Sequence, residues 1–473
     1  MTSPFQCLSL SWRHIAVGLA IFAITGCRVG PNYHPPAVPI PPAFQEATAN
    51  SNLPPLAGSD WWTVFEDATL TDLERQAVAA NLDVRIASTH IDQADAYRRS
   101  IRSQEFPQIS ANPSISRTRE AQDRPNNGNT SGKAATYNDL QLPLILNYEI
   151  DAWGRIRRLV ASAQAAQQAT QADLNFTRLT ATAAVAINYF TLREADTETA
   201  IVQSTIVDLQ RGYEITDNQF RRGLVSELAS AQAETILDQT NARVEALHIQ
   251  RAQSEHAIAA LLGRPVEGFS IEVIPTLSPP PAIPPGMPAD VLRRRPDVIS
   301  AERNEASASE QIGVAQAAYF PQLSLSGLTG FESANPGAIF TWQNTIASLA
   351  AGAAAPIFTG GRLRANVDQA KANYQQSELQ YQKTVVTSYQ EVEDQLASLH
   401  YLANEYQSEE KAVTDASRAE KIANNRYQAG LVGYLDVVYA QQTLLQNQET
   451  TQQVQGQRLI STVSLIRALG GGW

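Results

Sequence analysis

The sequence predicts a mainly helical protein with pairs of β-strands, in a plan that occurs twice along the chain. Three observations support this fold class. Apolar residues make up 43% of the 473 residues but aromatic residues only 7%, which suits long helices with narrow seams better than one thick core. Two Phe-Pro junctions separate helical patterns from alternating ones. Several motifs of the first half return in the second half, 214 residues later before the predicted strands and 207 residues later after them.

Charge, cysteine and histidine content exclude several function classes. The net charge of −11 leaves no basic excess to neutralise phosphates, so no nucleic-acid partner is expected. The short basic clusters at residues 155–158 and 293–295 are interpreted as solvated faces. The two cysteines and six histidines form no metal-ligand pattern, and phosphate-loop and Gly-x-Ser-x-Gly motifs are absent. We therefore expect neither an enzyme nor a metal or other bound cofactor.

Residues 1–26 have the pattern of a signal peptide. Arg13 precedes the apolar run IAVGLAIFAI, which is too short to span a membrane as a stable helix. The run ends in Ile-Thr-Gly-Cys, which resembles the bacterial lipobox, whose cysteine is lipidated and becomes the new N-terminus. This resemblance implies an N-acyl and an S-diacylglycerol group on Cys27 and a firm membrane anchor. A signal peptide with an incidental cysteine is the alternative.

The residues after Cys27 bear on destination and form. Position two of the mature chain is Arg28 rather than the aspartate linked with inner-membrane retention, so the lipobox resemblance implies the outer membrane. Residues 27–60 are rich in proline and polar residues. They are expected to form an extended, lipidated tether with little structure of its own.

The first repeat is expected to cover residues 61–263. A helical pattern starts after Trp61-Trp62 and runs to about Arg102, and it ends at Phe106-Pro107 because proline disfavours helix at the residue before it. Within residues 107–151, two segments alternate apolar and polar residues, which predicts strands joined by a polar loop. Helices fill residues 155–262, and the first of them would be roughly 100 Å long at ~1.5 Å per residue.

A second copy of this plan follows a Pro-rich equatorial linker at residues 264–288, in which one short strand is predicted at Ile271 to Ile274. The second repeat covers residues 289–473, with strands within 321–358 and long helices within 361–469. RYQAGLVGYL matches QFRRGLVSEL of the first half, and Gly-Arg pairs open the long helix in both copies. These matches indicate an internal duplication.

The long helices and the strands each predict a packing partner. Apolar residues in the second copy are spaced alternately four and three apart, which is a heptad stripe typical of coiled-coil contact: Val385, Tyr389, Val392, Leu396, Leu399, Ala403 and Tyr406. Strands in lipid must close into a barrel, and four cannot close, since the smallest natural barrels use about eight. The chain either shares a membrane barrel with other copies, or its strands are soluble.

The order of elements and three motifs resemble the TolC-type outer-membrane efflux channels. The motifs are LRRRPDVISAERNEASASEQIGVAQAAYFPQLSLSG, GGRLRANVDQAKANY and GCRVGPNYHPP, the last typical of the NodT-like lipoprotein branch. The resemblance covers nearly the whole mature chain. It implies a homotrimer in the outer membrane of a Gram-negative bacterium, with a twelve-stranded barrel continuous with a twelve-helix periplasmic tunnel.

The same resemblance implies a function and partners. Such channels are the exit duct of a tripartite efflux system and passively conduct drugs or other toxic small molecules, as in multidrug resistance. A periplasmic adaptor protein and an inner-membrane transporter, of the resistance-nodulation-division type, are the implied partners, besides outer-membrane lipid. The alternative from the residues is a non-conducting coiled-coil lipoprotein that braces another envelope complex.

The free ends of the long hairpins are candidate sites. Family channels carry an aspartate at the place of Asp436 and a tyrosine at the place of Tyr427, which implies a periplasmic gate in which three carboxylates attract cations. A solvated aspartate favoured by the helix dipole is the alternative. The chain departs from some members, since Val432 replaces an arginine and Tyr439 a second acidic residue.

Two glycine turns are candidate docking surfaces for the adaptor's helical hairpin. They are Gly223-Leu224-Val225 and Gly430-Leu431-Val432. A simpler interpretation is a glycine C-cap followed by an apolar clamp, and both can hold together.

Overall fold

The computed structural model describes residues 28–39, 41–46, 60–121, 136–284, 286 and 288–471. The predicted signal peptide and Cys27 lie outside the described residues. The chain forms two compact units. The first contains the N-terminal segment to Pro36 with residues 92–169 and 302–380, and the second contains residues 37–91, 170–301 and the part from Tyr381 onward. Each unit therefore takes segments from both predicted repeats.

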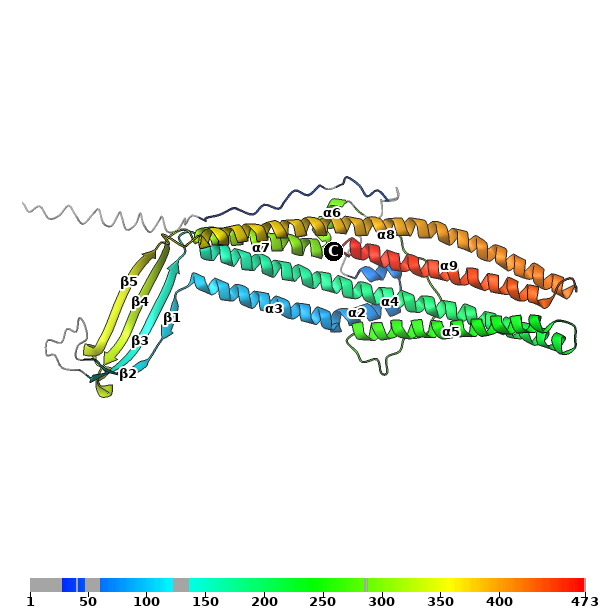
Figure 1. Cartoon of the computed structure of the whole chain (residues 1–473), viewed down its shortest axis with the longest axis horizontal. Coiled ribbons are helices and arrows are strands. Elements are labelled where there is room, and N and C mark those ends of the chain that lie inside the picture. The colour runs from blue at the N-terminus through cyan, green and yellow to red at the C-terminus, as the bar shows by residue number, and fades with distance from the viewer. Residues whose placement is uncertain are drawn as a thin grey trace, which may run out of the picture. The chain divides into compact units, whose positions relative to one another are not determined.

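The first unit contains one antiparallel sheet, whose strands lie side by side in Figure 1. β1 (Gln108–Ala111) and β2 (Ser114–Arg119) both pair with β3 (Thr136–Ile150), which pairs with β4 (Gln322–Ser333), which pairs with β5 (Thr345–Ala354). The first predicted strand is broken at Pro113, which cannot donate a hydrogen bond to the ladder. The fourth strand, expected to reach Phe358, ends at Ala354, shortly before Pro356.

The sheet has one apolar and one polar face. Residues opposite each other on paired strands share a face, so Ile109, Leu146 and Leu349 form one apolar row with Gly327. The next row, on the other face, contains Asn147, Ser326 and Ala350. Ile109 is 70% and Leu349 is 77% exposed. The predicted period-two alternation is confirmed, and the described residues do not cover its apolar face.

The proline in the middle of β3 is accommodated by a glycine on the neighbouring strand. Pro143 lies opposite Gly330. A Cβ atom at position 330 would lie 2.2 Å from the carbonyl oxygen of Leu142. The missing side chain therefore lets β4 approach β3 at a point where proline removes a ladder donor.

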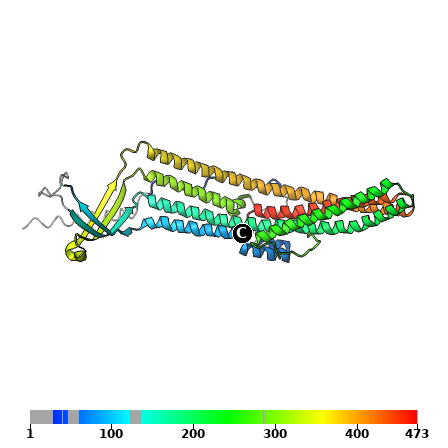
Figure 2. The same cartoon turned by 60° about the horizontal axis from the view of Figure 1, so that its bottom comes forward.

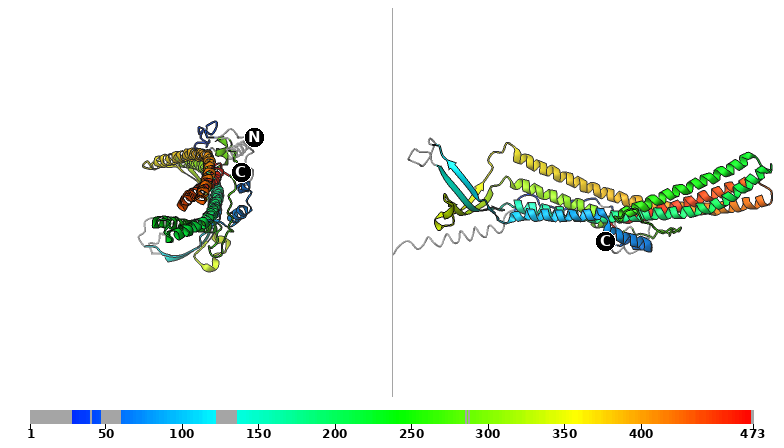
Figure 3. Two further views of the ribbon diagram at one scale, coloured as in Figure 1. Left: turned by 90° about the vertical axis from the view of Figure 1, so that its right-hand side faces the viewer. Right: turned by 90° about the horizontal axis from the view of Figure 1, so that it is seen from below.

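Two long helical hairpins follow the strands. α4 (Arg155–Arg221) and α8 (Arg362–Gln428) have 67 residues each, and the returning helices α5 (Glu227–Leu261) and α9 (Tyr434–Ala468) have 35 each. Figure 2 and the right-hand view of Figure 3 show both hairpins, α4 in teal to green with α5 in green, and α8 in yellow to orange with α9 in orange to red. The equal lengths are the clearest structural sign of the duplication. Across the described ranges, no helix combines the length and apolar character needed to cross a membrane.

The helix predicted from Trp61 to Arg102 is interrupted. A 3-10 turn at Trp61–Phe65 leads into α2 (Ala68–Ala80), and α3 (Leu82–Arg102) follows after a break at Asn81. The amide of Asn81 donates to the carbonyl of Leu261 at 2.8 Å and accepts from the backbone N–H of Val84 at 3.0 Å. One side chain thus caps α3 and binds the last turn of α5.

The second repeat has the same break. α6 (Pro288–Arg294) and α7 (Pro296–Ala317) are separated at Arg295, whose guanidinium donates to the carbonyl of Ala468 at 3.1 Å. A Cβ atom at Gly470 would lie 2.8 Å from the carbonyl carbon of Arg294, and one at Gly263 would lie 2.7 Å from the carbonyl oxygen of Ala80. In both copies, a glycine after the returning helix lets the chain pass close to the break.

The core of the second unit contains the central part of the predicted heptad stripe. Val385 and Val392 are fully buried, as are Val185 and Leu192 of the first copy. Tyr189 is also buried, and its hydroxyl donates to Asp67 at 2.6 Å. The largest cluster adds aromatic residues from the N-terminal 3-10 turn and from α4: Trp61, Trp62, Phe65 and Phe190.

The short strand predicted at Ile271 to Ile274 is wrong, because side chains rather than a neighbouring strand bind this backbone. The N–H of Ile271 donates to Glu255 at 2.6 Å, and its carbonyl accepts from Arg251 at 2.6 Å. The N–H of Ile274 donates to Asp196 at 3.3 Å. Ion-paired side chains on α4 and α5 therefore supply the hydrogen bonds that this extended backbone needs, and no neighbouring strand is required.

The interpretation of the basic clusters as solvated faces is wrong for two of their members. Arg158 is 0% and Arg295 is 4% exposed. Arg158 pairs with Glu310 at 2.8 Å, and Arg295 pairs with Asp297 and Glu391, both at 2.7 Å. Burial of a guanidinium is tolerated here because carboxylates and carbonyls satisfy its donors.

The described part of the predicted tether contains no helix or strand, but it is held at several points. In the first unit, the N–H of Val29 donates to the carbonyl of Trp153 at 3.1 Å. In the second unit, the N–H groups of Gln45 and Glu46 donate to Glu393 at 2.7 and 3.1 Å. The described part of the tether is therefore held in place by hydrogen bonds and is not free.

Candidate functional site

The turn between α4 and α5 is closed by a left-handed glycine. Gly223 has φ +71°, a conformation that residues with a Cβ rarely adopt. Its N–H donates to the carbonyl of Phe220 at 2.7 Å, and the N–H of Leu224 donates to that of Gln219 at 2.8 Å. These two bonds form a Schellman-type C-cap.

The turn between α8 and α9 repeats this geometry. Gly430 also has φ +71°. Its N–H donates to the backbone carbonyl of Tyr427 at 2.9 Å, and the N–H of Leu431 donates to the backbone carbonyl of Arg426 at 2.9 Å. The two predicted glycine turns are therefore structural equivalents that cap two helices in the same way.

The leucines after these glycines point into solvent. Leu224 is 71% exposed and Leu431 is 69% exposed, while Val225 and Val432 are half-buried. An apolar clamp alone would bury the residue that follows the glycine. Within the described chain, the clamp therefore leaves most of both leucine surfaces uncovered.

Tyr427 belongs to an aromatic contact next to the second turn. Its ring lies 4.8 Å from that of Tyr434 at an interplanar angle of 84°, an edge-to-face pair. The amide of Gln219 donates to the Tyr427 hydroxyl at 3.4 Å, a long bond between α4 and α8. Tyr427 thus joins both hairpins at their free ends.

Tyr434, which the sequence analysis missed, is the centre of this contact. It is 8% exposed and packs with Leu209, Ile236 and Val438. A Cβ atom at Gly212 of α4 would lie 2.6 Å from Cε1 of the Tyr434 ring. The ring therefore occupies space that only a glycine leaves free. A glycine within a long helical pattern was the sequence signal that could have indicated such a close approach.

Asp436 lies in the first turn of α9, and its side chain is exposed. Its N–H donates to the carbonyl of Gly433 at 3.2 Å. No lysine or arginine among the described residues forms an ion pair with it. Asp436 and Tyr427 lie on either side of one turn, but no contact joins them directly. Within the described part of one chain, the Asp436 carboxylate therefore has no ion-pair partner.

A buried acidic cluster lies further along the hairpins and was also missed. Glu194 and Glu198 of α4 share their surroundings with Arg243 of α5 and Glu449 of α9. Arg243 donates to Glu198 and to Glu449, both at 2.9 Å. The pKa of Glu194 is raised to about 8 and that of Glu198 to about 7, mainly by burial and also by a neighbouring glutamate, while Arg243 lowers both in part. The single positive charge of Arg243 cannot balance the negative charges of all three glutamates if each were ionised.

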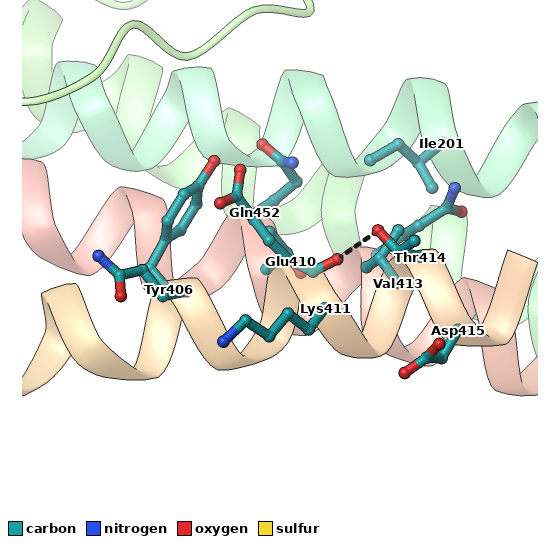
Figure 4. Close-up of a pocket in the computed structure, with 11 residues that line it drawn as sticks. Ile201, Tyr406, Glu410, Lys411, Val413, Thr414, Asp415 and Gln452 are labelled. Carbon is teal, nitrogen blue, oxygen red and sulfur yellow. Dashed lines mark hydrogen bonds between the residues drawn. The ribbon is translucent and has the colours of Figure 1, made fainter.

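An open groove of about 870 Å³ lies among α4, α8 and α9 in the second unit. Figure 4 shows Ile201 above a row of α8 side chains, in which the Thr414 hydroxyl donates to the Glu410 carbonyl at 2.9 Å. Amide, hydroxyl and charged side chains line most of it, and the lining offers no nucleophile paired with a base. Among the described residues, no cluster of histidine, cysteine and acidic side chains has the geometry of a metal site.

Comparison with known proteins identifies the architecture. The profile of the family described as "Outer membrane efflux protein" matches residues 73–264 and 287–471. The chain belongs to this family. The resemblance to TolC-type channels is thereby confirmed, as is the exit-duct role: the chain is the outer-membrane channel of an efflux system, with a large periplasmic part.

Individual relatives cover almost the whole chain. The solvent efflux pump outer membrane protein SrpC of Pseudomonas putida is 30% identical over 461 residues, which are 96% of this chain and 97% of SrpC. The cation efflux system protein CusC of Escherichia coli O6:H1 is 27% identical and covers 95% of this chain and 97% of its own. The outer-membrane channel OprN matches with a TM-score of 0.88 at 27% identity, over 94% of this chain and all of its own. These relatives are efflux proteins rather than enzymes.

Proposed function

We propose that three copies of this efflux channel close one twelve-stranded barrel that continues into a tunnel of twelve helices. The observation that supports this most directly is the sheet. Its apolar face is exposed, and within the described residues β5 pairs only with β4 and β1 only with β3. Strands in lipid need partners at both edges. Copies of the same chain would supply them, β5 of one against β1 of the next.

The gate of the tunnel is proposed at the free ends of the hairpins. Three Asp436 carboxylates around a threefold axis would attract cations and repel one another when the mouth is tight. Tyr427, held by Tyr434 and Gln219, would keep α8 and α9 close to α4 in the closed state. Opening would be a population shift towards a splayed mouth that partner proteins bind better.

The partners are proposed to be a periplasmic adaptor and an inner-membrane transporter of the resistance-nodulation-division type. The exposed Leu224 and Leu431 at equivalent turns support an adaptor surface, because a helical hairpin could bury both. Relatives are named for solvent and for cation efflux. We propose small toxic compounds as cargo, with selectivity set by the transporter rather than by the tunnel wall.

An N-acyl and S-diacylglycerol modification of Cys27 is proposed to anchor the N-terminus in the outer membrane. The lipobox-like sequence supports it. A non-conducting periplasmic scaffold is the competing function. It would retain the helices and the lipid, but it gives no reason for a two-faced sheet in which β3, β4 and β5 have 15, 12 and 10 residues, enough to cross a membrane.

Single-channel conductance of the purified trimer in a planar bilayer tests this function. Wild type should give small, cation-preferring currents, and Asp436→Asn should lower the cation preference without abolishing conduction. Glu227→Gln is the matched control, because Glu227 is the acidic residue in the first turn of the other returning helix. Equal effects of both substitutions would remove the gate role from Asp436, and silent, inserted trimers would favour the scaffold.

A further inference from the structure

The alternation of apolar and polar residues along β3 is interrupted at one level of the sheet. The residues LPLIL at positions 142–146 are apolar at five successive positions. Successive residues of a strand point to opposite sides of the sheet. This run therefore places apolar side chains not only on the apolar face but also on the face that is otherwise polar.

The two neighbouring strands show the same interruption at the same level. Leu328 of β4 lies opposite Ile145. One row further along, Pro143 lies opposite Gly330, and Gly330 lies opposite Ile346 of β5. Residues opposite each other on paired strands share a face, so these side chains form two adjacent rows on the polar face. We call Pro143, Ile145, Leu328 and Ile346 the apolar band.

Polar residues lie on both sides of the apolar band. In the direction of the helices, Asn147 lies opposite Ser326, and Glu149 follows one row later. In the opposite direction, Gln141 lies opposite Glu332. The polar face therefore changes to apolar and back to polar within the length of the strands.

Packing within one chain does not account for the apolar band. Ile145, Leu328 and Ile346 are all half-buried. None of the three belongs to the buried hydrophobic clusters that the described residues form. The alternation that a lipid-facing strand needs would be complete with polar residues at these positions, so the band serves the other face.

We propose that the apolar band lines the lumen of the barrel and binds the apolar part of the cargo, so that the cargo is a small organic molecule with such a part. This inference rests on the proposed trimeric barrel, in which the apolar face lies against lipid and the polar face is turned inward. Three copies would continue the band around the lumen. Barrel diameter grows with the number of strands, and twelve strands let the band line a passage rather than fill it.

The height of the band suits transient binding. Its two rows are two residues apart, which is roughly 7 Å along a strand at ~3.3 Å per residue. Cargo that reaches the band removes part of its apolar surface from water, and it returns to water at the next polar row. Conduction needs binding that favours entry and still permits release. The transporter selects the compounds that enter the tunnel, and the band favours organic compounds over inorganic ions, which gain nothing from an apolar wall.

Block of the single-channel current by two organic cations tests the band. The purified, full-length trimer is recorded in a planar bilayer in potassium chloride, with tetramethylammonium or tetrabutylammonium added on the barrel side. Both probes carry one positive charge, so their comparison isolates the contribution of the apolar part. In wild type, tetrabutylammonium should block at a concentration at least about tenfold lower, since burial of about two of its additional methylene groups is sufficient for this ratio.

Three variants locate the block. Ile145→Thr with Ile346→Thr makes the band polar on two strands and keeps β-branched side chains, which suit a strand. This double variant should bring the two blocking concentrations to within about threefold of each other. Leu328→Asn on the strand between them should also lower the ratio by at least about threefold, and it tests the band if the double variant forms no trimers. Leu349→Thr is the matched control, because Leu349 lies on the apolar face of β5 and is 77% exposed, so the ratio should stay at the wild-type value.

Each result decides for or against the band. Equal blocking concentrations of the two cations in wild type would overturn it, as would a ratio that the double variant and Leu328→Asn both leave unchanged. An equal loss of the ratio in Leu349→Thr would also overturn it, because that side chain faces away from the lumen. Inserted trimers without any current would overturn the proposed pore together with the band, whereas a current without preference for the larger cation would overturn the band alone.

Discussion

Gly212→Ala is predicted to weaken the contact between α4 and Tyr434 near the free ends of the hairpins. In the structure, the added Cβ atom would lie 2.6 Å from Cε1 of Tyr434 and 3.2 Å from Cγ2 of Val438. Ordinary contact begins at 3.4 Å, so the ring must move by about 0.8 Å. Because Tyr434 also supports the ring of Tyr427, this displacement reaches the proposed gate.

The size of the effect follows from two opposing terms. Overpacking a well-packed contact costs about 1–3 kcal/mol. Alanine is favoured over glycine in a helix interior by about 1 kcal/mol, which offsets part of this cost. The net destabilisation of the closed arrangement is therefore about 0–2 kcal/mol. At ~1.4 kcal/mol per factor of ten, the open population should rise by up to about 30-fold.

Single-channel recording of Gly212→Ala should show more frequent or longer openings than wild type. Gly433→Ala is the control, because Gly433 has φ −74° and no atom lies within 4 Å of its added Cβ. Tyr434→Leu removes the clashing ring atom, so in the double variant Gly212→Ala should have little further effect. An unchanged opening rate in Gly212→Ala, with the trimer intact, would refute the idea that this contact holds the mouth closed.

Three further predictions concern stability. Burial raises the folded-state pKa of Glu194 to about 8 and that of Glu198 to about 7, above the ordinary value of 4.5. The contribution of these two groups to folding stability is therefore fully present below about pH 4.5. It is lost as the pH rises through 7 and 8, because the buried carboxyls must then ionise. The melting temperature should therefore fall between pH 5 and 8, and the double Glu→Gln variant should flatten this slope; an unaltered slope would place the cause elsewhere. Gly430→Ala should destabilise the second hairpin by about 1–2 kcal/mol in urea titrations, because alanine is strained at φ +71°, whereas Gly433→Ala, at the N-cap of α9 with φ −74°, should cost less than about 1 kcal/mol. Asn81→Ala removes a helix cap and a bond to α5 and should cost about 1–3 kcal/mol in the same assay; a loss below 0.5 kcal/mol would show that neither bond matters.

Local chemistry made the main elements predictable from the sequence. Proline disfavours helix at the residue before it, so both helix-to-strand changes were visible at Phe106 and Phe320. Period-two alternation predicted the two faces of the sheet, and the repeated Gly-Leu-Val turns predicted the hairpins. These features depend on neighbours in sequence, which a single chain displays directly.

Features that depend on distant partners were not predictable. The Asn81 break needs the carbonyl of Leu261, and the burial of Arg158 needs Val29 and Gly30. The sequence close to Asn81 or Arg158 gives no indication of these partners, which lie more than 120 residues away. The linker at Ile271 has the pattern of a strand, but a strand needs a neighbour, and side chains of α4 and α5 supply the hydrogen bonds instead.

The candidate site was predictable only in part. The glycine turns and Asp436 stood out because the duplicated motifs aligned them. Tyr434 did not, since its counterpart in the first copy is Glu227 and its role arises from Gly212 on another helix. The acidic cluster at Glu194 escaped notice for the same reason, because its members come from three helices.

Release of a small solute from liposomes that contain the purified protein measures whether the chain conducts. The expected result is that trapped solute of a few hundred daltons escapes through the trimer, faster with Gly212→Ala than with wild type, while a large dextran in the same liposomes is retained. Retention of the small solute by both proteins, with trimers shown to be inserted, would contradict the channel and leave the scaffold as the better explanation.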